Sequence, residues 1–73
     1  MNTPLDSVTS VMAEISRLVL LPKTSENVEA FENAIGQAKA IIAEDSKTLG
    51  YLVQDDPINY AVMIAMAMWT LKG

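Results

Sequence analysis

The spacing of apolar residues predicts helices over most of this chain. Apolar side chains recur every three or four positions between residues 4 and 20 and again between residues 25 and 49. This period places them on one face of a helix. The predicted faces are Leu5, Val8, Met12, Ile15 and Val19 in the first segment, and Val28, Phe31, Ile35, Ala38, Ile42 and Leu49 in the second. Each helix is therefore expected to bury one face and to leave the other in solvent.

Residues that cap helices set the expected boundaries. Thr3 before Pro4 is a typical start, and Pro22 closes the first helix because the residue before a proline is disfavoured in the helical region. Gly50 suits the position that follows a helix C-terminus. A break near Asp45 is the alternative for the second helix, since acidic side chains are unfavourable at that end. The expected helices are about 4–20, 25–49 and 57–71.

The third segment, 57–71, differs from the others because nearly all of its faces are apolar. Asp56 before Pro57 predicts its start, as a cap and a first-turn proline. Two neighbouring helices cover only part of such a helix, and a large exposed apolar patch usually marks an interface. We therefore expect it to contact a partner. The expected interface residues are Ala61, Ile64, Ala65, Met66, Met68 and Trp69.

The length of the chain limits how it can be stabilised. The 73 residues form one domain, 1–73, which buries a smaller fraction of its surface than a longer chain does. Cysteine and histidine are absent, so a disulfide is impossible and a structural zinc site is not expected. Association of chains remains. We expect an all-α fold, a small three-helix bundle or a helical hairpin plus a C-terminal helix, completed by formation of a dimer.

The charge balance restricts the possible partners. Nine carboxylates outweigh five scattered cations, which gives a net charge of −4. No direct contact with nucleic acid is expected, because such binding normally needs a basic stripe. The apolar run 58–71 is shorter than the about 20 residues of a membrane-spanning helix, and no secretory signal begins the chain. We therefore expect no membrane contact and a cytoplasmic location.

Two groups of carboxylates are candidate sites. Asp55 and Asp56 could act as an acid–base pair or bind a cation, but the proline that follows favours a helix cap with a solvated neighbour. Glu26, Glu29 and Glu32 could face a metal ion, but carboxylate bundles generally add histidines, which this chain lacks. No catalytic residue, cofactor or metal ligand is therefore expected.

Two further features concern packing. Gly36 lies inside the second helix, where glycine costs about 1 kcal/mol relative to alanine, so a close contact is expected there. The connection 51–54 is rich in apolar residues and is expected to pack against the helices.

The leading functional expectation is a non-catalytic, acidic helical protein that self-associates and binds or regulates another protein, as an accessory or adaptor protein does. The alternative is a structural subunit of a larger assembly, such as a virion or a secretion apparatus, which would share the same sequence features. An enzyme is not expected, because chains this short seldom enclose a pocket and histidine and cysteine are absent.

Overall fold

The computed structural model describes residues 4–72, and all secondary structure in this range is helical. The elements are α1 (Pro4–Val19), α2 (Ser25–Thr48), a short 3₁₀ helix η1 (Val53–Asp55) and α3 (Pro57–Leu71). The all-helical fold with three principal helices is the one that the apolar spacing predicts, and α2 is continuous through Asp45. Thr3, the expected cap of α1, lies outside the described residues, as does the side chain of Leu5.

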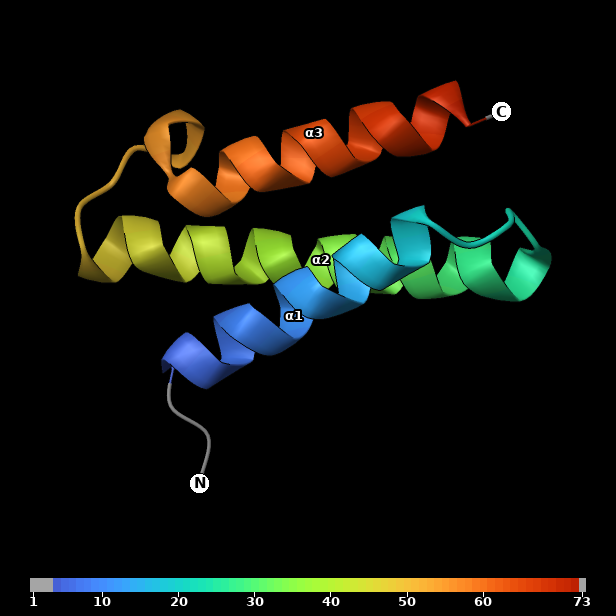
Figure 1. Cartoon of the computed structure of the whole chain (residues 1–73). Coiled ribbons are helices and arrows are strands. Elements are labelled where there is room, and N and C mark those ends of the chain that lie inside the picture. Colours follow the sequence, from blue (N-terminus) through green and yellow to red (C-terminus); the bar gives the residue numbers. More distant parts are fainter. Residues whose placement is uncertain (1–3, 73) are drawn as a thin grey trace.

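Each helix runs antiparallel to the next one along the chain (Figure 1). The Cα atoms extend over 36 × 29 × 14 Å. Packed helix axes lie about 8–10 Å apart and the Cα cylinder of a helix has a radius of about 2.3 Å, so the smallest dimension holds no more than two layers of helices. No helix is therefore enclosed by the other two.

A single apolar core joins the three helices. Among its most deeply buried side chains are Ile15 and Leu18 of α1 and Val62 of α3. The core consists of Val11, Ile15, Leu18 and Val19 of α1, Phe31, Ala34, Ile35, Ala38 and Ile42 of α2, and Val62, Ala65 and Trp69 of α3. The most apolar helix, α3, thus supplies the smallest number of buried side chains.

The buried face of α1 is wider than predicted. Ile15 and Val19 are buried as expected, whereas Met12 is only partly buried. Val11 and Leu18 are buried although the predicted stripe does not include them. The reason is that α1 packs against both α2 and α3, so two adjacent strips of its surface are covered.

The ends of α2 follow the capping rules. The Thr24 hydroxyl accepts a hydrogen bond from the Asn27 amide at 3.2 Å. Gly50, directly after the C-cap residue Leu49, has a φ of +78°, in the left-handed region that favours glycine. Leu49 is exposed, in contrast to the prediction, because the helix ends at Thr48 and no longer directs the next side chain onto the core.

The connection between α2 and α3 also differs from the prediction. Its apolar side chains project into solvent rather than packing against the helices, because the chain passes beyond the end of α2 before it enters η1 (Figure 1). These exposed residues, which we call the loop patch, are Leu49, Tyr51, Leu52 and Val53.

Gly36 does not mark a close helix contact, so that prediction is wrong. The residue is exposed, and a Cβ atom added to it would meet no heavy atom within 4 Å. It borders an open groove between α2 and α3 rather than the backbone of another helix. The glycine therefore disfavours the helix and makes no packing contact that offsets this cost.

The Gly36→Ala substitution is expected to raise the free energy of unfolding by about 0.5–1 kcal/mol, because alanine favours the helix and restricts the unfolded chain. Urea unfolding followed by circular dichroism measures the change. A loss of stability would show that the position is more constrained than the open space around it implies.

The Gly50→Ala substitution is expected to act in the opposite direction. An alanine held in the left-handed region costs about 1–2 kcal/mol, so the free energy of unfolding should fall by this amount. The same urea titration applies. Unchanged stability would mean that the chain can leave α2 without a left-handed residue.

Candidate functional site

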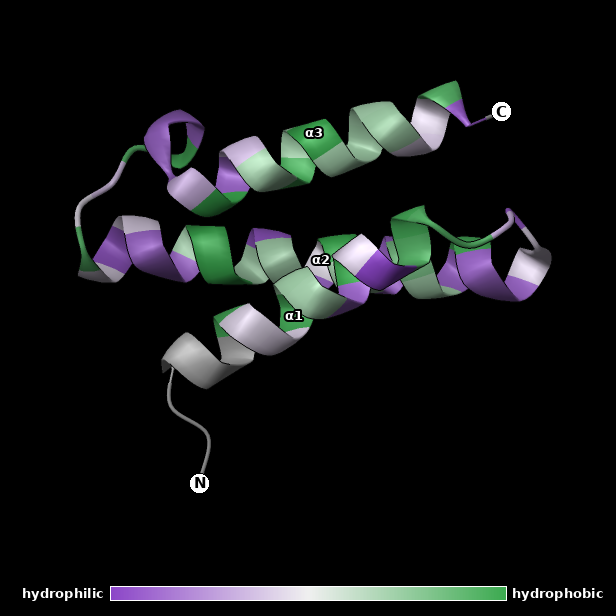
Figure 2. Cartoon of the chain, in the orientation of Figure 1, coloured by the Kyte–Doolittle hydropathy of each residue, from purple (hydrophilic) through white to green (hydrophobic). Residues whose placement is uncertain are grey.

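The surface of α3 that faces away from the core is the main candidate site. Val62, Ala65 and Trp69 are spaced three and four residues apart and face the core. Figure 2 shows mostly apolar residues in the middle of α3, whereas polar and apolar residues alternate along α2. On the side opposite the core, α3 exposes Tyr60, Met63, Ile64, Ala67 and Leu71, which we call the outer face.

Trp69 fixes α3 to the rest of the chain. Its ring stacks on Phe31 with a centroid separation of 4.3 Å and an interplanar angle of 7°. The Lys23 ammonium lies 5.3 Å from the centroid of a Trp69 ring, within the range of a cation–π contact. Ala65 lies on the same buried stripe. Both Ala65 and Trp69 were predicted at an interface, and the structure places them in the core of the chain itself.

A groove of about 300 Å³ separates α3 from α1. Four of the predicted interface residues line it, namely Ala61, Ile64, Met68 and the buried Ala65. Leu20, just after the end of α1, also lines the groove and is 78% exposed. The only polar side chain in the lining belongs to Ser16, so this α1–α3 groove continues the outer face as one uncharged apolar surface.

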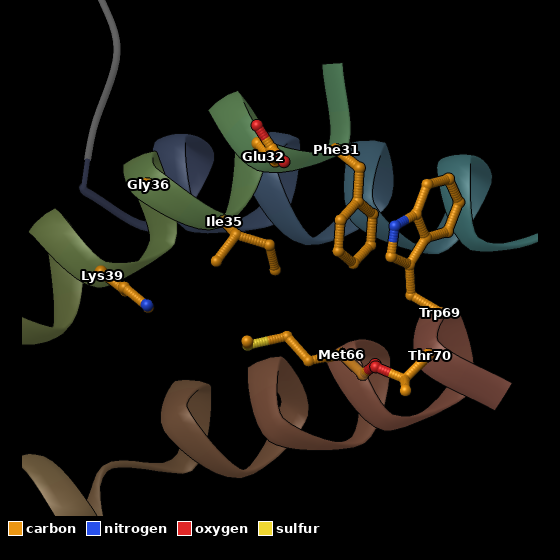
Figure 3. A pocket seen from close by; sticks show the side chains of 8 residues that line it. All are labelled: Phe31, Glu32, Ile35, Gly36, Lys39, Met66, Trp69 and Thr70. Atoms are coloured by element: carbon orange, nitrogen blue, oxygen red, sulfur yellow. The ribbon is translucent and has the colours of Figure 1, made fainter. Parts of the chain in front are cut away.

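A second groove, of about 410 Å³, lies between α3 and α2. Met66 extends into it from α3 toward Ile35 on α2 (Figure 3). Glu32 and Lys39 also line this groove, so it is more polar than the α1–α3 groove. The six predicted interface residues thus lie in three places, and Met66 does not share a surface with Ile64.

Sequence reasoning missed several residues of the exposed apolar surface. Tyr60, Met63 and Leu71 on α3, and Leu20 beyond α1, were not among the predicted contacts. The spacing of positions 60, 64, 67 and 71 is itself a helical stripe, which could have indicated the outer face. It was obscured because the other positions of the same helix are apolar as well.

The charged residues at the two ends of α3 bond within the chain. The Lys72 ammonium donates a hydrogen bond to the backbone carbonyl oxygen of Val19 at 2.6 Å, at the negative end of the α1 dipole. At the other end, Oδ1 of Asp56 accepts a hydrogen bond from the Ile58 amide at 2.8 Å. Between them α3 contains no charged residue. The outer face is therefore neutral along its length.

The predicted cap at the start of α3 is confirmed. Asp56 is buried and caps the helix, and Asp55 is exposed beside it. The structure also brings Asp56 together with Asp45 of α2, a pair that the sequence did not suggest. The pKa of Asp45 is raised above its ordinary value by burial, by a hydrogen bond to Asp56, and by the negative charges of Asp56 and Glu44.

The other candidate carboxylates do not form a cluster. Glu26, Glu29 and Glu32 are exposed on α2. Across the described part of the chain, no group of three or more carboxylates is arranged to hold a metal ion.

Comparisons with models of protein families, with curated proteins and with solved structures find no match. Of the helices within residues 4–72, none combines the length and the apolar character needed to cross a membrane.

Replacing Trp69 with alanine is expected to lower the free energy of unfolding by about 3–5 kcal/mol, because it removes the stacked ring and leaves a cavity. The matched control is Met66→Ala, on the same helix but 40% exposed, which should cost clearly less. Urea unfolding compares the two variants. Equal losses would show that the stack on Phe31 does not anchor α3.

Proposed function

We propose that this protein is a non-catalytic, acidic helical module that forms a homodimer through the outer face of α3 and, in that state, binds or regulates another protein in the cytoplasm. The exposed apolar surface of α3 carries the proposal. Ile64 and Leu71 are 62% and 86% exposed, although both are large aliphatic side chains. Removing one such side chain from water contributes about 1.5–3 kcal/mol, so a partner that covers this surface would stabilise the chain substantially.

The distribution of charge supports a second copy of the chain as that partner. With a net charge of −4, two copies repel each other in most orientations. The repulsion is least where the contact contains no charge, and the outer face of α3 meets this condition. Lys72 and Asp56, the charged residues at the ends of α3, already bond within the chain.

The spacing along the outer face suits two antiparallel copies of α3 related by a two-fold axis. With the axis midway between positions 64 and 67, Ile64 lies opposite Ala67 of the second copy, and Tyr60 opposite its Leu71. The large side chain of Ile64 then packs against the small one of Ala67 near the axis. The two helix dipoles are antiparallel, which is electrostatically favourable. A standard interface buries about 800 Å² per partner, more than one face of a helix this short provides, so the contact would extend over the α1–α3 groove.

The loop patch is the proposed contact for a different protein. It lies outside the outer face of α3, so dimer formation leaves it free. Its apolar residues are followed by the exposed Gln54 and Asp55. We propose that the partner presents an apolar surface bordered by basic side chains. The absence of histidine and cysteine from the sequence, and the open, largely apolar grooves of the described chain, support a binding role over catalysis.

A second candidate function is a structural subunit of a larger assembly. The observation that favours it is the presence of two separate apolar surfaces, the outer face of α3 and the loop patch. If the loop patch of one copy contacted the outer face of the next, the contact would be head-to-tail, and such contacts build rings or open filaments rather than closed dimers.

Sedimentation equilibrium at micromolar concentration tests the dimer. The wild-type protein should have the mass of two chains, and Ile64→Glu the mass of one, because the new charge would be buried in the contact. Ile64 is exposed in the single chain, so the variant should keep its helical circular dichroism spectrum. Gln37→Glu adds the same charge to an exposed position of α2 and should remain a dimer.

A wild-type mass of one chain would contradict the dimer. A mass that grows beyond two chains with concentration, and falls to that of one chain in Leu52→Ser, would instead support the assembly subunit.

A further inference from the structure

Asp56 is buried to an extent unusual for a carboxylate, with 1% of its surface exposed. Its Oδ1 atom accepts the hydrogen bond that caps α3. Its Oδ2 atom is also buried and has no hydrogen-bond donor among the described residues. A buried polar atom left without a partner costs about 1–3 kcal/mol, and more when it is charged. The arrangement therefore calls for a donor that faces Oδ2.

A hydrogen bond to Asp56 is one of the causes that raise the pKa of Asp45, in the last turn of α2, so the two carboxyl groups are neighbours. Two ionised carboxylates cannot bond to each other, because both are acceptors only. Neither carboxylate is part of an ion pair, since the one ion pair within residues 4–72 joins Arg17 to Glu14. A hydrogen bond between Asp45 and Asp56 therefore requires a proton on one of them.

We propose that Asp45 and Asp56 share one proton, which connects the end of α2 to the start of α3 and makes the docking of α3 dependent on pH. The proton lies between the Asp45 carboxyl group and Oδ2 of Asp56, while Oδ1 of Asp56 stays bonded to the Ile58 amide. Among the neighbouring ionisable groups in sequence, Glu44 of α2 acts on Asp45 through its negative charge. Asp55 of η1 precedes Asp56, and Lys47 of α2 is the nearest cation in sequence to Asp45. Loss of the proton leaves two like charges, one of them buried.

The direction of the pH effect follows from the pKa of Asp45. Burial, the hydrogen bond to Asp56 and the charges of Asp56 and Glu44 all raise this pKa above its ordinary value of 3.8. The folded chain therefore binds the proton more tightly than the unfolded chain. The stability due to the shared proton is fully present below the ordinary pKa and is lost as the pH rises through the raised one. This inference does not depend on the proposed dimer.

The test is urea unfolding of the whole chain at about pH 4.5 and pH 7.5, at one protein concentration and one ionic strength. The wild-type midpoint should be higher at the lower pH. In Asp45→Asn the amide donates to Oδ2 of Asp56 without a titrating proton. At pH 7.5 we expect the urea midpoint of this variant to be higher than that of the wild type. The difference between its midpoints at the two pH values should be at most half of the wild-type difference.

Asp55→Asn is the matched control, because it removes the same charge from an exposed residue next to Asp56. It should keep the pH dependence of the wild-type protein. If Asp45→Asn and Asp55→Asn change the urea midpoint by the same amount, the pH dependence comes from the net charge of the chain. That result would refute the shared proton. Magnesium or calcium chloride that stabilises the wild type but not Asp45→Asn at pH 7.5 would also refute it, in favour of a bound cation.

A direct readout covers the case in which Asp45→Asn does not fold. Carboxyl carbon NMR of the wild-type protein should show Asp45 titrating above its ordinary value. A titration of Asp45 at its ordinary value would overturn the proposal.

Discussion

The stack of Trp69 on Phe31 is the contact on which the position of α3 depends. Besides this ring, α3 contributes only Val62 and Ala65 to the buried core, and both are much smaller. Aromatic side chains bury the most apolar area, so the orientation of α3 follows from where the indole fits between the helices. Because that fit uses a single stripe of a helix that is apolar on nearly all sides, the rest of the helix is left in solvent. The exposed surface of the protein is thus a direct result of its main internal contact.

Polar groups also hold the two ends of α3. Asp56 at its start meets Asp45 of α2, and Lys72 after its end bonds to the carbonyl of Val19 on α1. The helix α3 therefore contacts α2 through polar groups at its start and α1 through a hydrogen bond at its end. Of the groups involved, Asp56 is buried, whereas Lys72 is exposed although its ammonium is bonded to the chain. An apolar helix with neutral sides and polar attachments at its ends suits a contact between chains of like charge.

The sequence was a good guide to local structure and a poor one to the position of side chains between helices. Apolar spacing predicted the three helices, and Asp56 and Gly50 marked two of their boundaries, because these signals act within a few residues. The core-facing side of α3 could not be predicted, since its sequence is apolar on nearly every side. The meeting of Asp45 with Asp56 was missed for a related reason: they lie on different elements, and no local rule joins them. Leu49 shows the same limit, because its spacing fits α2 but the helix has already ended.

The unequal contributions to the core have a consequence for how the chain opens. Nine of the twelve buried apolar residues belong to α1 and α2, which form a hairpin of adjacent segments. Cooperative units with few buried contacts open with the smallest free energy, so α3 is expected to detach while the hairpin persists. Its amide hydrogens would then exchange with solvent through a partial opening rather than through global unfolding. Each such opening uncovers Phe31 and carries Trp69 into water, which makes the indole fluorescence of this single tryptophan a natural reporter of the partly opened state.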